Sequence, residues 1–279
     1  MTTKQKKELD DRARALRRLI LKMVGGEAGK VGHLGGSNSA ADIVAALYFY
    51  KMKVNPQNPR DEDRDRFLLS KGHAALVQYA ALAELGFFPV EEIKQIKNLG
   101  AMLQGHPDMT RTPGVEANTG SLGMGLSIGF GMALGMRMDN NPRKVYIILG
   151  DGELAEGQVW EAVMTCAHYK ADNLVAVVDH NKVQAMGRTA ERFEIGDLNA
   201  KFTSFGWHVI QIDGHNMIEI CNALDAADDV TGKPTVIIAD TIKGKGVSFA
   251  EGNAAFHNAG LTLEQYEIAV RDIDNYVCR

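Results

Sequence analysis

Two short apolar runs, separated by one helix-length segment, constrain the fold of this chain more than any other feature. Residues 144–149 (KVYIIL) and 173–179 (NLVAVVD) are almost unbroken apolar stretches rich in β-branched side chains. This pattern is typical of strands buried inside a parallel sheet. Residues 158–169, between them, have the length and period of a helix. A strand, a helix and a second strand in this order predict a βαβ unit.

The same alternation continues along the chain. From residue 65 we expect a short strand, a turn and then a helix to about residue 85. Further strands are expected at 207–212 and at 234–240, and further helices at 8–23, 40–51, 90–98, 122–137, 197–205, 217–227 and 263–277. We therefore predict an α/β fold with a parallel sheet and helices on both faces, in a single domain over residues 1–279.

Three local expectations accompany this fold. The basic residues of the first helix are expected on a solvated face: Arg12, Arg14, Arg17, Arg18 and Lys22. The glycine-rich stretch around His33 is expected to be a loop outside the core. Ser39 and Asp42 suit the start of the helix that follows this loop.

Composition excludes several classes of protein. The 31 basic and 35 acidic residues give a net charge of −4, which argues against a nucleic-acid surface. Cys166, Cys221 and Cys278 have neither disulfide nor metal-site spacing, which fits a reducing cytoplasm. No apolar signal segment or membrane-spanning run is present in the sequence, so we expect a cytoplasmic protein without membrane contact.

Polar residues follow both apolar runs at the point where each strand should end. Asp151 lies in the GDG sequence after the first run, and Asn181 follows the second run, 30 positions later. Neighbouring strand ends on the carboxyl edge of a parallel sheet form a ligand crevice. A carboxylate, an amide oxygen and the carbonyl of Val183 suit Mg²⁺, with a diphosphate and water completing six ligands. The alternative is that GDG is only a tight turn.

The GDG sequence with its later Asn resembles the thiamine diphosphate signature, and the surrounding segments resemble transketolases. The resemblance implies Mg²⁺ bound by Asp151, Asn181 and the Val183 carbonyl. It implies that the cofactor is bound by Gly152, whose amide would meet the diphosphate, and by Glu153. Glu156 resembles a glutamate that lies at the subunit interface and links two active sites.

Four histidines match transketolase segments. His33 and His106 resemble substrate-facing histidines, His73 resembles one that meets the diphosphate, and His257 resembles one that contacts both cofactor and substrate. Gly120, Ser121 and Leu122 resemble a turn that packs against the aminopyrimidine ring. The chain departs from the usual pattern at Leu34, Ser121 and Phe256. His215 matches no family segment and is expected to be a turn histidine, and three further histidines are expected to be structural: His168, His180 and His208.

The resemblance covers nearly the whole chain but only the N-terminal part of a full-length transketolase. In the family, the cofactor is activated by a glutamate of the next domain, the pyrimidine-binding domain. We therefore expect an α2β2 assembly with a C-terminal partner subunit, which transfers a two-carbon ketol unit between sugar phosphates. His33, His106 and His257 would donate hydrogen bonds or shuttle protons near neutral pH. The alternatives are a deoxyxylulose-phosphate synthase or oxo-acid dehydrogenase subunit, and a non-catalytic assembly subunit.

Overall fold

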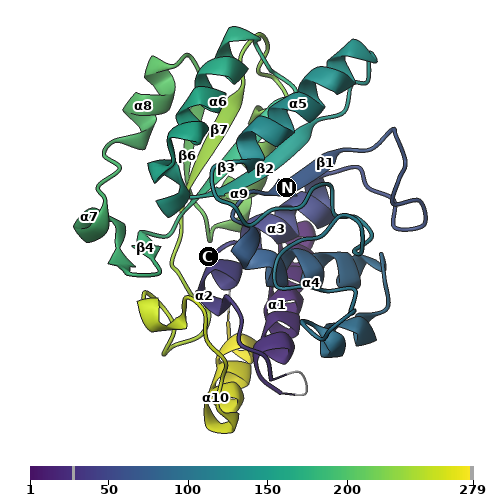
Figure 1. Cartoon of the computed structure of the whole chain (residues 1–279), viewed down its shortest axis with the longest axis vertical. Coiled ribbons are helices and arrows are strands. Elements are labelled where there is room, and N and C mark those ends of the chain that lie inside the picture. Colours follow the sequence, from purple (N-terminus) through teal and green to yellow (C-terminus); the bar gives the residue numbers. More distant parts are fainter. Residues whose placement is uncertain (27–28, 277–279) are drawn as a thin grey trace.

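One parallel sheet organises the protein, as the sequence predicts. The structure, a computed structural model, describes residues 1–26 and 29–276. The strands lie in the order β1-β2-β3-β7-β6, and all neighbours are parallel (Figure 1). Their bounds are β1 Arg66–Leu69, β2 Val145–Gly150, β3 Leu174–His180, β6 His208–Asp213 and β7 Thr235–Asp240.

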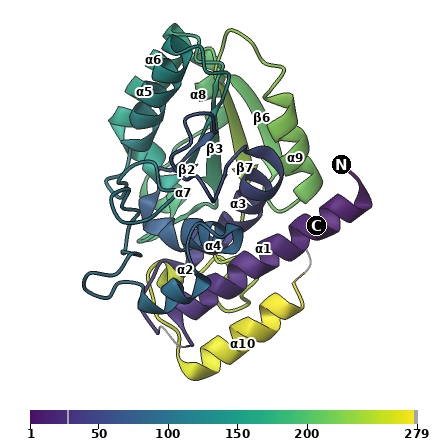
Figure 2. The same cartoon turned by 90° about the vertical axis from the view of Figure 1, so that its right-hand side faces the viewer.

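Helices cover both faces of this sheet (Figure 2). One face carries α5 (Gly125–Met138), α6 (Gly157–His168) and α8 (Leu198–Ser204). The other carries α1 (Thr3–Val24), α3 (Ala41–Ala46), α4 (Ala75–Leu85) and α9 (Met217–Ala226), and α10 (Leu263–Asp274) packs along α1. Side chains of β2 alternate between two cores: Tyr146 and Ile148 join one, Ile147 and Leu149 the other. Because both faces are covered, the central strands β2, β3 and β7 are almost entirely buried and apolar, whereas the edge strand β6 is mostly half-buried and carries polar side chains.

Short elements complete the chain. They are α2 Leu34–Ser39, a π-helical turn Leu47–Lys51, the 3₁₀ turns Gly72–Ala74, Val90–Gln95, Gly152–Ala155 and Ala254–Phe256, β4 Val183–Gln184, β5 Gly187–Arg188 and α7 Thr189–Arg192. The helix expected at residues 90–98 is thus a 3₁₀ segment. The end of the helix expected to reach residue 277 lies outside the described residues.

The solvated basic face predicted for the first helix is wrong at one position. Arg17 is fully buried, and its guanidinium pairs with the buried Asp42 at 2.7 Å. Arg12 and Arg18 do lie at the surface, in ion pairs with Glu84 and Asp274. A buried arginine is tolerated here because a carboxylate from another helix neutralises it.

The glycine-rich stretch after His33 is not a loop outside the core. Leu34–Ser39 forms the short helix α2, and every residue of it is buried. Asp42 lies in the first turn of α3, as expected, but the role expected for Ser39 is wrong. Ser39 does not cap α3; its Oγ instead donates to Asp179 at 2.6 Å. Small side chains in α2 allow it to pack closely between α1 and α4, which outweighs their poor helix propensity.

No helix in residues 1–26 and 29–276 is long and apolar enough to cross a membrane.

Candidate functional site

A cavity of about 260 Å³ opens at the carboxyl ends of β2 and β3. Asp151 and Asn181 both line it, so the two strand ends meet as the sequence predicts. Gly150 and Asp179, the last β2 residue and its partner on β3, are in register beneath them. The remaining lining residues are Gly36, Lys71, His73, Gly120, Leu122, Gly150, Gly152, Glu153, Val183, Gln184, Ala185, Lys243 and His257.

The three predicted metal ligands lie together at this edge. Asp151 accepts hydrogen bonds from the amides of Gly152, at 2.7 Å, and Lys182. The Asn181 side chain accepts from the Val183 amide at 3.2 Å, so its amide oxygen is oriented by the backbone. The Val183 carbonyl accepts from Lys243 Nζ at 2.9 Å.

These groups fit a hard cation that also meets phosphate oxygens. Burial and the nearby Asp179 raise the pKa of Asp151. A bound cation would therefore stabilise the ionised form of this carboxylate. Carboxylate and carbonyl oxygens keep further lone pairs for a metal. The described residues contain no cluster of three or more His, Cys, Asp or Glu side chains suited to a metal. The site therefore resembles a magnesium–phosphate site, in which the protein supplies few ligands, more than an all-protein cage.

The four predicted histidines gather beside the cavity. The ring centroid of His33 lies 5.1 Å from that of His73, 6.2 Å from His106 and 5.2 Å from His257, and His73 lies 5.2 Å from His257. They come from four separate segments of the chain, so only the fold brings them together. A sequence match to each segment was the signal that found them.

The expectation that His33, His106 and His257 titrate near neutrality is wrong. Burial, followed by neighbouring positive charge, lowers the pKa of His33 to about 3, of His73 to about 2 and of His257 to about 4. Burial and Lys97 also lower the pKa of His106. All four are therefore neutral imidazoles at pH 7, each with one donor and one acceptor nitrogen.

At two glycines that line the cavity, the backbone packs closely against neighbouring side chains. A Cβ on Gly152 would lie 2.8 Å from Gln184 Cγ, and one on Gly120 would lie 2.8 Å from the His106 ring, with φ of +140°. Close by, buried polar atoms have no hydrogen-bond partner within the described chain: His33 Nδ1, Thr119 Oγ1 and Gln184 Nε2. Such atoms normally find partners. They fit a polar ligand such as thiamine diphosphate, which would meet them.

Glu153 lines the cavity, and its carboxylate stabilises the surrounding backbone. Its oxygens accept from Ser70 Oγ and from the amides of Gly123, at 2.8 Å, and Gly150, at 3.0 Å. It thereby ties the turn that carries Gly120 to the end of β2. Its contact with a cofactor stays a prediction.

The other predicted residues lie at the rim. Leu122 reaches the cavity, Ser121 is exposed next to it, and Glu156 is exposed at the N-cap of α6. An exposed carboxylate beside the cavity is accessible to a partner, as the interface role of Glu156 requires.

Sequence reasoning missed two buried lysines. Lys71 donates to the Gly36 carbonyl at 2.8 Å and pairs with Asp179 beneath the cavity. Lys243 contacts the Val183 carbonyl and, at 3.0 Å, His257 Nδ1. Burial and the charge of Lys71 lower the pKa of Lys243 to about 8. Their signal was present, since each lysine adjoins a glycine in the loop after a strand.

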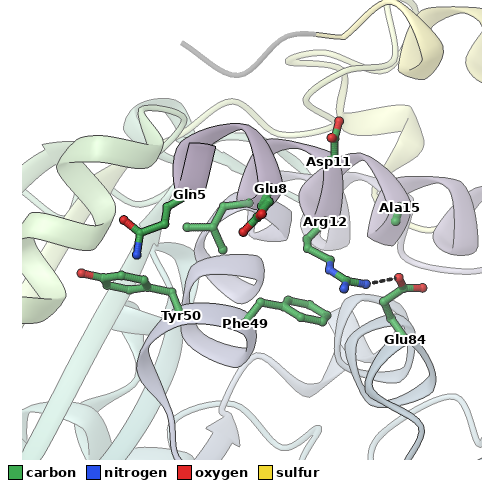
Figure 3. Close-up of a pocket in the computed structure, with 9 residues that line it drawn as sticks. Gln5, Glu8, Asp11, Arg12, Ala15, Phe49, Tyr50 and Glu84 are labelled. Carbon is green, nitrogen blue, oxygen red and sulfur yellow. Dashed lines mark hydrogen bonds and ion pairs between the residues drawn. The ribbon is translucent and has the colours of Figure 1, made fainter. Parts of the chain in front are cut away.

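A larger groove of about 610 Å³ lies elsewhere, between α1, α4 and the turn Leu47–Lys51 (Figure 3). Within it, Arg12 donates to Glu84 at 2.6 Å and its guanidinium lies over the Phe49 ring. It holds none of the matched motifs, so the smaller cavity is the candidate site.

Comparison with known proteins identifies the family. Residues 10–273 match the family described as "Transketolase, thiamine diphosphate binding domain". The chain belongs to the transketolase family. It is 46% identical over 272 residues to a 6-deoxy-6-sulfo-D-fructose transketolase subunit of Clostridium sp., covering 98% of both chains. It is 42% identical to an apulose-4-phosphate transketolase subunit of Phocaeicola vulgatus, covering 89% of this chain and 88% of that one.

Solved transketolases share the fold. The Leishmania mexicana enzyme superimposes with a TM-score of 0.89 at 31% identity. The Pichia stipitis enzyme in complex with sedoheptulose 7-phosphate gives 0.87 at 33% identity. Each alignment covers 95% of this chain but 41% of the other, so this transketolase chain corresponds to less than half of those proteins. Its thiamine diphosphate-binding domain is the part they have in common.

Proposed function

We propose that this chain is the N-terminal subunit of a two-chain transketolase that moves a two-carbon ketol unit from a ketose to an aldose phosphate. One observation supports this most strongly. A single cavity gathers Asp151, Asn181 and two lysines, and the four matched histidines adjoin it. The cavity therefore combines lysines that can bind a diphosphate, oxygen ligands that can bind a metal ion, and neutral histidines that can hydrogen-bond a sugar.

Each part of the site has a role in this proposal. Asp151, Asn181 and the Val183 carbonyl would hold Mg²⁺, and the Gly152 amide would donate to the diphosphate. Bound thiamine diphosphate supplies carbanion stabilisation, and the protein orients it.

The histidines would serve the substrate. His33, His106 and His257 would hydrogen-bond its oxygens as neutral imidazoles. In that state they can either donate or accept a proton without carrying a permanent charge into the cavity.

A partner subunit is part of the proposal. Large apolar side chains are exposed on or beside α5 and α6: Leu122, Met124, Met138, Met164 and Tyr169. Added Cβ atoms at Gly131 and Gly135 of α5 would meet nothing within 4 Å, so space is open along this helix. Exposed apolar surface beside a site is typical of an interaction face. We propose that the pyrimidine-binding subunit covers it, within an α2β2 assembly in the cytoplasm.

The substrate is proposed from the named relatives. Two relatives that match over most of their length are named for a sulfonated ketose and for apulose 4-phosphate. We propose a ketose with an anionic group at its far end, either phosphate or sulfonate. Pentose-pathway sugar phosphates remain the reference donors for an assay.

Reconstitution with the partner tests this function. We expect the lone chain to be inactive and the pair to transfer ketol units from xylulose 5-phosphate, or from its sulfonated or branched counterparts. Use of pyruvate instead would indicate a synthase or dehydrogenase. Full turnover by the lone chain would contradict the split enzyme.

Calorimetry with thiamine diphosphate and Mg²⁺ separates an enzyme from a scaffold. Asp151→Ala should weaken cofactor binding by the pair at least a hundredfold, because a buried metal ligand is lost. Equal affinity of the variant and the wild type would refute the proposed metal site.

A further inference from the structure

The segment 241–246 (TIKGKG) follows β7 and carries Lys243 into the cavity. Besides backbone hydrogen bonds with His180, Gly35 and Gly252, three contacts with the side chains of Asp179, His215 and Arg17 hold this segment. Thr241 Oγ1 donates to Asp179, and the Ile242 amide donates to His215 Nε2 at 2.9 Å. The carbonyl of Lys245 accepts from Arg17 Nε at 3.2 Å. None of the residues that make these three contacts lines the cavity.

Two of the three contacts converge on Asp42. Its carboxylate accepts from Arg17 Nη1 at 2.8 Å, from Arg17 Nη2 at 2.7 Å and from His215 Nδ1 at 2.7 Å. Arg17 and Asp42 are fully buried, and His215 is 3% exposed. His215 is thus more than the turn histidine expected from the sequence, because its ring links α3 to the segment after β7.

The charge of Asp42 decides which nitrogen of His215 carries the proton. Burial alone would raise the pKa of Asp42, but the Arg17 guanidinium and the hydrogen bonds from Arg17 and His215 hold it well below its usual range. An ionised carboxylate only accepts, so His215 Nδ1 carries the proton and Nε2 is left as an acceptor. That acceptor faces the Ile242 amide.

We propose that His215 is a positioning residue for the cofactor site: Asp42 fixes its tautomer, its Nε2 fixes the Ile242 amide, and the next residue, Lys243, is thereby aimed at the diphosphate. The inference rests on the proposed function. It assigns to His215 a role that no matched motif predicts, and it places the group outside the cavity.

Two substitutions separate the two hydrogen bonds of His215. An asparagine amide overlies the Nδ1 position of histidine, so His215→Asn keeps the donor to Asp42 and leaves the Ile242 amide without an acceptor. A glutamine amide reaches the Nε2 position, so His215→Gln keeps the acceptor for Ile242 and loses the bond to Asp42. Each variant removes one buried hydrogen bond, which makes them matched controls.

The experiment uses the reconstituted complex and makes two measurements. Amide hydrogen exchange of peptides covering residues 241–246 is measured without cofactor. The affinity for thiamine diphosphate is measured in the presence of Mg²⁺. In His215→Asn, we expect exchange to be at least tenfold faster and the dissociation constant about tenfold higher. In His215→Gln, both should lie within threefold of wild type. Urea midpoints of the two variants should be alike, since each loses one bond.

Equal loss of affinity in both variants, or loss that follows the urea midpoints alone, would overturn the positioning role. If His215→Asn does not fold, His215→Gln decides: a more than tenfold loss of affinity contradicts the inference, and near-wild-type affinity supports it. Failure of the wild-type complex to bind thiamine diphosphate would instead refute the proposed function. The exchange measurement would still decide whether His215 orders the segment.

Discussion

Lys243 should make cofactor binding depend on pH above neutrality. Its pKa is lowered to about 8 by burial and by Lys71, so at about pH 9 only about a tenth of the cofactor-free protein carries the ammonium ion. A bound diphosphate would raise the pKa of Lys243 again, because its negative charge attracts the protonated side chain. The neutral form of Lys243 does not gain this attraction. The apparent dissociation constant then scales as one plus the ratio of neutral to charged Lys243. It should rise about tenfold, or about 1.4 kcal/mol, between about pH 7 and about pH 9.

Titration calorimetry in two buffers of different ionisation heat measures this coupling on the reconstituted complex. Binding should take up about 0.9 proton at about pH 9 and about 0.1 proton at about pH 7. The histidines do not contribute in this window, because burial lowers the pKa values of His33, His73 and His257 to about 3, 2 and 4. Lys243→Met is the control, with weaker and nearly pH-independent binding. The same proton uptake in this variant would refute the assignment to Lys243.

Three further predictions concern stability and assembly. Arg17→Met should cost about 3–5 kcal/mol of unfolding free energy in urea, because it removes the guanidinium that neutralises buried Asp42, whereas the exposed Arg18→Met should cost under about 1 kcal/mol. Gly72→Ala should cost about 1–3 kcal/mol in the same assay, since its Cβ would lie 2.6 Å from the Gly120 amide nitrogen. Gly135→Ala should stabilise the unassembled chain by up to about 1 kcal/mol in thermal unfolding and weaken partner binding in a pull-down titration; unchanged partner affinity would count against the proposed face.

The sheet was predictable because its chemistry is local. Strands buried on both faces read as continuous apolar runs, and the residues that end two of them, Asp151 and Asn181, must meet at one edge. The residue pattern therefore predicted both the architecture and the position of the cavity.

Buried charge was not predictable in the same way. Arg17 looks like its solvated neighbours in α1, and only the packing of α1 on α3 brings it to Asp42. Lys243 and the low histidine pKa values likewise depend on how segments far apart in sequence enclose one cavity. The helix α2 forms although its glycines have low helix propensity, because the packing of its buried residues outweighs that propensity.

The exposed thioethers of Met124, Met138 and Met164 have a consequence for the life of the unassembled chain. Oxidation would turn each into a polar, chiral sulfoxide, a change that reductases reverse. On the face that we propose for the partner subunit, such damage would block pairing while leaving the fold intact. Peroxide would then inactivate the proposed enzyme by preventing its two subunits from associating. Reduction of the sulfoxides would restore activity without new protein synthesis.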